Sequence, residues 1–138
     1  MKIIFDKTLE TGVSWQDKQH KELFDRMSAL SEAMEGNLKK AEVERLLDFL
    51  DEYAVVHFHN EERAMHETGF PKTLPHLEKH MVFIEEIARL AAELDKGVSA
   101  KLAEEVRVKL VEWFKNHICV MDKELGSFLI KKSGGQAS

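Results

Sequence analysis

Residues 57–61 read His-Phe-His-Asn-Glu, and this stretch decides how the rest of the chain is interpreted. A histidine and a glutamate four residues apart lie about 40° apart on a helix, one turn above each other, so His57 and Glu61 can reach inward to one point. His76 and His80 repeat the same spacing downstream. The stretch therefore indicates a helix whose inner face carries groups suited to binding a metal.

Apolar residues at helical spacing surround this pair and recur in three other segments. Their period predicts four long helices. These run over residues 14–36, 38–67, 73–97 and 99–126, with Ser14, Thr73 and Ser99 placed as caps. Because the connections between them are short, we expect an all-α fold, an antiparallel up-down-up-down four-helix bundle.

The flanks of this bundle carry weaker signals. Residues 1–13 lack a helical period and are expected to form an extended N-terminal arm. After Gly126, a short C-terminal helix over residues 128–130 is expected to pack back on the bundle. With 138 residues the chain fits one domain, which we place at residues 1–132, followed by a flexible tail over residues 133–138.

Composition restricts the partners and the compartment. The net charge is −5, and the basic residues are scattered, which argues against nucleic acid or an anionic membrane as the partner. No run approaches the roughly 20 apolar residues that a membrane span needs. A single cysteine excludes an internal disulfide, and Asp6 comes too early for a signal peptide. We therefore expect a cytoplasmic monomer.

Seven polar side chains lie on or near the inner faces of the four helices. Since alternate helices run in opposite directions, all seven fall at one end of the bundle. They are His20, His57, Glu61, His76, His80, His117 and Asp122. Buried ionisable groups need a partner, and seven ligands exceed the four of a structural zinc site, so the set suits two ions. By ligand type alone these ions are iron, zinc, copper or nickel.

One spacing does not fit a regular helix. His117 and Asp122 are five residues apart, or about 140° on an α-helix, so they face one site only if the turn is widened. A π-type turn brings such residues into line and is often found at functional sites. We therefore predict a local distortion between these two residues.

The joint pattern resembles the hemerythrin family, and more closely the single-domain bacteriohemerythrins. The motifs are QH ending at residue 20, HFxxEE at 57–62, HxxxH at 76–80 and HIxxxD at 117–122. The resemblance covers almost the whole chain. Two departures are Gln16, where relatives often have an aliphatic residue, and Phe5, where tryptophan is common; we expect neither to touch a ligand.

The resemblance implies two iron ions bridged by carboxylates and an oxo or hydroxo group. By position, His76, His80 and His117 would hold one iron, and His20 and His57 the other. Glu61 and Asp122 would bridge them. The iron with two histidines would keep an open position for O2. We expect an apolar pocket around that position, lined by Leu23, Phe58, Trp113 and Phe114.

Three functions compete for this pattern. The first is reversible O2 binding without catalysis, as a carrier, buffer or store, with a protein acceptor for O2 as a possible partner. A shell of five neutral donors and two anions favours it, because ferritin-like di-iron proteins use more carboxylates. The alternatives are an oxygen or redox sensor that signals through a partner, and a di-iron enzyme that handles peroxide or nitric oxide.

Several polar residues near the motifs have simpler roles. His59 and His66 fall away from the inner face and are expected in solvent. Glu62 is turned about 100° from Glu61, so we place it on the surface or behind a ligand. Asp17 either caps the first helix or orients His20.

Overall fold

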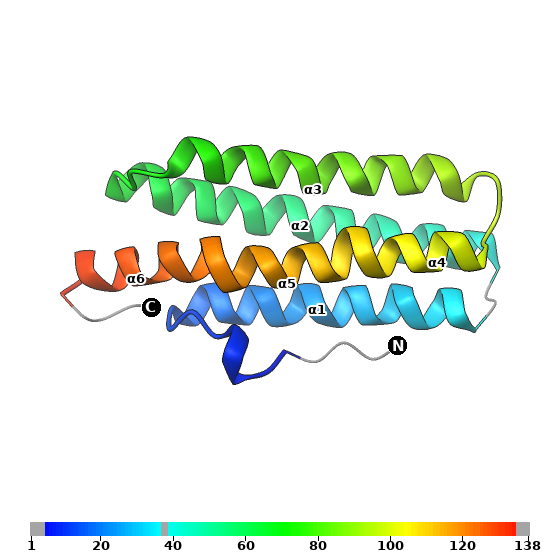
Figure 1. The fold of residues 1–138 in the computed structure, drawn as a ribbon, viewed down its shortest axis with the longest axis horizontal. Coiled ribbons are helices and arrows are strands. Elements are labelled where there is room, and N and C mark those ends of the chain that lie inside the picture. Colours follow the sequence, from blue (N-terminus) through cyan, green and yellow to red (C-terminus); the bar gives the residue numbers. More distant parts are fainter. Residues whose placement is uncertain (1–4, 37–38, 135–138) are drawn as a thin grey trace.

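Four long helical segments lie side by side in the computed structural model, which describes residues 5–36 and 39–134 (Figure 1). The first three are α1 (Ser14–Glu35), α2 (Lys40–Thr68) and α3 (Thr73–Leu94). The fourth is built from α4 (Ala100–Val106), η2 (Arg107–Glu112), α5 (Trp113–His117), η3 (Ile118–Asp122) and α6 (Lys123–Lys132). Neighbouring segments run in opposite directions, so the expected all-α up-down-up-down bundle is confirmed.

Short connections enforce this antiparallel order. The helix α2 ends at Gly69, whose φ of 69° is left-handed and favours a residue without a Cβ. The Phe70 amide then donates to the Met65 carbonyl at 3.0 Å, which closes the turn into α3. At the other end, the Ser99 hydroxyl accepts from the Leu102 amide at 3.1 Å and caps α4 as predicted.

The apolar core has two parts. The larger part fills the space among all four segments and includes fully buried Phe24, Leu50 and Phe83. A smaller cluster of Met65, Phe70 and Leu125 lies near the turn between α2 and α3. Buried polar residues separate the two clusters, so the polar site lies inside the bundle with apolar packing on either side.

Asp17 holds the N-terminal segment against the start of α1. A short 3₁₀ helix, η1 (Lys7–Leu9), precedes α1. Asp17 Oδ1 accepts from the Thr11 amide at 2.7 Å and from its hydroxyl at 2.9 Å, and Oδ2 accepts from the Gly12 amide at 3.2 Å. The prediction that Ser14 caps α1 is wrong, since Val13 is the N-cap and provides no side-chain bond. Asp17 therefore ties the arm to α1.

Two other expectations also need correction. The fourth segment does not end at Gly126, which lies buried within α6, so the last helix continues its predecessor instead of turning back. The physical reason is close packing: a Cβ at Gly126 would lie 2.9 Å from the Thr11 Cβ, so glycine lets the arm approach the helix. Thr73 is the first residue of α3, and its hydroxyl donates to the Phe70 carbonyl at 2.6 Å rather than capping the helix.

Some predicted features fall outside what the structure describes. Residues 1–4 of the expected arm and residues 135–138 of the expected tail are outside the described residues. Among the described helices, none is long and apolar enough to cross a membrane.

Candidate metal centre

All seven side chains that the sequence singled out meet in the interior of the bundle. The helix α1 supplies one, α2 and α3 supply two each, and the fourth segment supplies two. They are His20, His57, Glu61, His76, His80, His117 and Asp122, and none is more than 5% exposed. Their convergence follows from the antiparallel order, which places residues early in one helix beside residues late in the next.

These side chains divide into two groups that could each hold a metal ion, with ligand atoms within 4.8 Å of one another. One group contains three histidines, His76, His80 and His117, and the other contains two, His20 and His57. The two carboxylates, Glu61 and Asp122, belong to both groups. We call these the three-histidine group and the two-histidine group.

Each carboxylate turns one oxygen to each group. In the three-histidine group, Asp122 Oδ1 lies 2.9 Å from Nε2 of His76 and 3.0 Å from Nε2 of His117. On the same side, Glu61 Oε1 lies 3.1 Å from Nε2 of His80. All three imidazoles therefore present Nε2 to the shared carboxylates.

The other carboxylate oxygens face the two-histidine group. Asp122 Oδ2 lies 2.9 Å from Nε2 of His20. Glu61 Oε2 lies 3.3 Å from Nε2 of His57 and 3.4 Å from Nε2 of His20. This division of oxygens is the arrangement expected of carboxylates that bridge two ions.

Several of these atoms are close to one another without forming hydrogen bonds. Nε2 of His20 and Oδ2 of Asp122 both lack a hydrogen-bond partner among the described residues, although 2.9 Å separates them. The same holds for His57 Nε2, Glu61 Oε1 and His80 Nε2. Leaving such atoms buried and unpaired costs about 1–3 kcal/mol each. Converging nitrogen and oxygen lone pairs therefore fit metal ions better than they fit each other.

Electrostatics favours a cation at this position. Burial lowers the pKa of His57, which favours the neutral imidazole that a metal needs. Burial would also lower the pKa of His20, but contacts with Asp122 and Glu61 outweigh it and raise the pKa to about 9. The site thus attracts positive charge, and a metal ion would take the place of the proton on His20.

The carboxylates are ionised despite their burial. Burial would raise the pKa of Glu61, but contacts with the imidazoles of His57 and His20 hold it well below its usual value. Burial and the charge of Glu61 would raise the pKa of Asp122, and His117 and His20 lower it well below its usual value. Two buried anions in one site need a positive counter-charge.

The irregular spacing between His117 and Asp122 is resolved as predicted. The segment η3 is a π-helix, in which the Lys123 amide donates to the Ile118 carbonyl five residues back. The wider turn brings the Asp122 carboxylate to the same side as His117, 3.0 Å from its Nε2. The predicted distortion is therefore confirmed.

A second π-helical segment, η2, was not predicted. It shifts the inner face of the fourth segment by part of a turn, so that the adjacent residues Leu110 and Val111 are both buried. Phe114 is then fully buried, whereas Trp113, which we expected beside it in the O2 pocket, is only partly buried. The signal available in the sequence was the adjacent pair Leu110 and Val111, because a regular helix does not turn two neighbouring residues to the same face.

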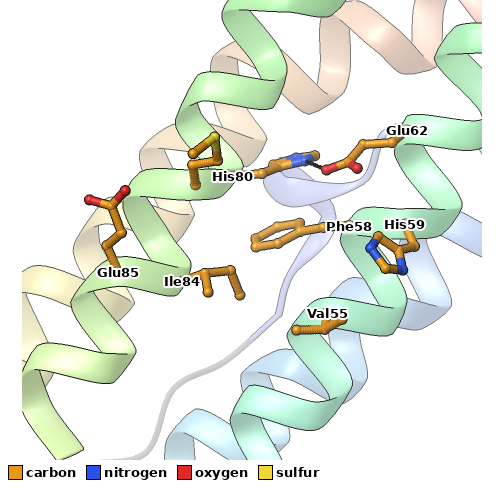
Figure 2. A pocket seen from close by; sticks show the side chains of 8 residues that line it. Val55, Phe58, His59, Glu62, His80, Ile84 and Glu85 are labelled. Carbon is orange, nitrogen blue, oxygen red and sulfur yellow. Dashed lines mark hydrogen bonds and ion pairs between the residues drawn. The ribbon is translucent and has the colours of Figure 1, made fainter.

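Two of the predicted ligand histidines contact polar side chains through the ring nitrogen that faces away from the shared carboxylates. Nδ1 of His57 lies 2.7 Å from Oε1 of Gln19. Nδ1 of His80 lies 3.0 Å from Oε2 of Glu62, as Figure 2 shows. Such contacts fix the ring orientation and the protonated nitrogen, leaving Nε2 free for a metal. Glu62 therefore lies behind a predicted ligand, which is one of the two positions expected for it.

The four residues expected to line an O2 pocket are distributed over both groups. The ring of Phe114 lies edge-on to His20, with centroids 5.5 Å apart, and to His57 at 6.3 Å. Phe58 stacks on His80 at 3.9 Å, and Trp113 stacks on His117 at 4.9 Å. Leu23 is fully buried on α1, three residues after His20. Phe114 thus lies nearest to His20 of the two-histidine group, and its ring is also 6.4 Å from that of His117.

A surface hollow lies beside the three-histidine group, between α2 and α3. Its volume is about 280 Å³, and Figure 2 shows Phe58, His80 and Ile84 along its wall. His59 lines it as well and is exposed, as is His66 elsewhere on α2, so both lie on the surface as predicted.

The expectation that Gln16 touches none of the predicted ligands is wrong. Its side chain is fully buried, and Nε2 donates to Oε2 of Glu61 at 2.8 Å. It therefore touches one of the seven predicted ligands. The available signal was spacing: Gln16 precedes His20 by four residues and shares its helix face, the same relation that links His57 to Glu61.

An antiparallel four-helix bundle that buries two histidine groups around a shared carboxylate pair defines a class of protein, the cation-binding helical bundles. The family model for the hemerythrin HHE cation-binding domain matches residues 11–129 of this chain. The chain belongs to the hemerythrin family.

Individual relatives agree with this assignment. A bacteriohemerythrin of Methylococcus capsulatus is 32% identical over 120 residues, which cover 86% of this chain and 89% of the relative. A bacteriohemerythrin of Stenotrophomonas maltophilia is 28% identical over 116 residues, which cover 84% and 74%.

Solved structures are also similar. The crystal structure of a wild-type hemerythrin has a TM-score of 0.79 at 29% identity and covers 91% of this chain and 97% of its own. A mutant of hemerythrin has a TM-score of 0.81 at 30% identity, with coverage of 94% and 98%.

Proposed function

We propose that this protein binds O2 reversibly at a pair of iron ions and acts as an oxygen carrier, buffer or store. His76, His80 and His117 would hold one iron, and His20 and His57 the other. Glu61 and Asp122 would bridge the two. The observation that carries the proposal is the division of each carboxylate between the two groups, one oxygen to each.

The unequal number of histidines in the two groups supports one open coordination position for an external ligand. With the carboxylates shared, the three-histidine group offers five protein ligands and the two-histidine group offers four. The two-histidine group therefore leaves more room for a molecule from outside. When bound there, a ferrous iron pair supplies the electrons and the coordination position that reversible O2 binding needs.

The surroundings support binding rather than turnover. Phe114 covers the imidazoles of His20 and His57, and its side chain is fully buried. An apolar cover of this kind excludes water and external reductants. The ligand set contains five neutral nitrogens and two carboxylates, fewer anions than the ferritin-like di-iron proteins use, which favours a modest redox change.

Metal analysis with optical spectra tests this function. We expect ferrous loading under argon to give two irons per chain. Air should then produce a charge-transfer band that disappears under vacuum. Fewer than two irons would contradict the proposed centre, and rapid consumption of a reductant in air would show an enzyme instead of a carrier.

A matched pair of variants tests the ligand assignment. His57→Ala should lose the metal of the two-histidine group, because Nε2 of His57 faces Glu61 in the interior. His59→Ala is the control, since His59 is exposed two residues away on the same helix. It should keep two irons, and equal iron content in both variants would overturn the assignment of His57.

A further inference from the structure

Gln16 is a buried amide in contact with the centre through Glu61. We propose that Gln16 is a positioning residue that holds Glu61 Oε2 toward the two-histidine group and shifts the redox balance of the bound iron toward the ferrous state. This inference rests on the proposed iron site. It assigns a role to a side chain outside the seven ligands.

The hydrogen bond has one possible direction. The Gln16 side-chain nitrogen lies 2.8 Å from Glu61 Oε2 and 3.4 Å from the Asp122 carbonyl oxygen. Both neighbours are acceptors, so the amide N–H groups point at them. Gln16 and Glu61 are both fully buried, and a hydrogen bond to a charge is strong where no water competes.

The contact is made on one side of the carboxylate. Gln16 touches Oε2, the oxygen that faces His20 and His57, while Oε1 faces His80. The amide therefore orients Glu61 and draws electron density from the oxygen nearest the two-histidine group. A carboxylate oxygen that accepts such a bond donates less to its metal and stabilises the higher iron charge less.

The side chain of Gln16 packs closely against helix α6 at Gly126. Its Oε1 has no hydrogen-bond partner among the described residues, so the stabilising contacts of this side chain are those of Nε2. A Cβ at position 126 would lie 3.3 Å from that oxygen, and Gly126 supplies none. Helix α6 thus leaves room for the side chain beside Glu61.

A redox titration tests the proposal. Iron-loaded Gln16→Leu and Gln16→Met proteins are compared with the unmodified protein, using mediator dyes that accept one electron from each ferrous iron. Both variants keep side-chain volume but remove the donor. We expect the ratio of ferrous to ferric protein at a fixed potential to fall about tenfold in each, the effect of losing one hydrogen bond to a charged group. Should the leucine variant fail to fold, the unbranched methionine variant carries the test.

The control is Ser31→Ala on the same helix. Ser31 is buried but lies eleven residues after His20, about 16 Å along the helix axis. The reduction potential of the iron-loaded Ser31→Ala protein should equal that of the unmodified protein. If the unmodified protein does not bind two irons, the proposed function fails. If it does, and both Gln16 variants titrate like it, the function stands and the role of Gln16 is refuted.

Discussion

Oε2 of Glu62 lies 3.0 Å from Nδ1 of His80, whose Nε2 faces Oε1 of Glu61 at 3.1 Å on the other side of the ring. The imidazole is therefore held between a buried carboxylate and one that is 30% exposed. Burial would lower the pKa of His80, but Glu61 and Glu62 together raise it. Glu62 connects the interior of the site to the hollow shown in Figure 2.

Removing this outer carboxylate should weaken the three-histidine group. Glu62→Ala frees the His80 ring to rotate and makes its Nε2 a weaker donor, so we expect iron affinity to fall about 10- to 100-fold. Competition with a ferrous chelator measures this. Glu67→Ala is the control, because Glu67 is exposed on the same helix. Equal retention of iron in the two variants would show that Glu62 is only a surface residue.

Shortening Phe114 should shorten the life of the oxygenated protein. Phe114→Leu opens space beside His20 and His57, which admits water to the side where we place O2. We expect the autoxidation rate to rise several-fold. The decay of the oxygen-dependent absorption band measures this rate.

Phe24→Leu provides the matched comparison for that change. The Phe24 ring is also fully buried and lies 5.6 Å from Phe114, one ring farther from the imidazoles. Both variants leave a similar cavity, so both lose stability. If they autoxidise at the same rate, Phe114 has no special role as a cover.

Metal removal should lower stability substantially. Without a metal, the interior retains two carboxylates and several ring nitrogens that are unpaired among the described residues, including both nitrogens of His20 and Nε2 of His57. A ligand that binds only the folded state at 1,000 times its Kd adds about 4 kcal/mol. We therefore expect the Tm of chelator-treated protein to fall by about 10 °C or more in calorimetry. An unchanged Tm would mean that the buried polar side chains do not need a metal to stabilise the fold.

Asp17→Asn should release the arm without altering the metal site. The new amide group would place a donor against the Gly12 or Thr11 donors, so at least one of the three hydrogen bonds is lost. We expect a loss of about 1–3 kcal/mol in the free energy of unfolding and faster amide exchange at Gly12. Asp25→Asn, an exposed position on α1, should change neither. Unchanged protection of Gly12 would contradict this account of the arm.

Some of the site was predictable because local geometry is strict. Residues four apart share a helix face, so His57 with Glu61 and His76 with His80 could be paired without coordinates. The five-residue step from His117 to Asp122 could not close on a regular helix, which made a widened turn predictable. The end of the second helix, predicted at residue 67, lies at Thr68.

Other features depended on how the segments pack. Gln16 was read as a harmless departure, yet packing of α1 against α2 brings its amide to Glu61. Trp113 and Phe114 were expected to line one pocket, yet after the π-helix η2 Phe114 is fully buried and Trp113 is only partly buried. Gly126 was read as a helix end, although the approach of Thr11 explains it inside α6.

By itself, the amino-acid sequence determined the four helices, their alternating direction and the seven side chains that face inward, because these follow from helical period and short connections. Only the tertiary structure decided which oxygen of Glu61 and Asp122 faces which histidine group, and which side chains contact the outer ring nitrogens of His57 and His80. Those choices depend on distances of about 3 Å between helices that are far apart in the chain, and no periodicity within one helix encodes them.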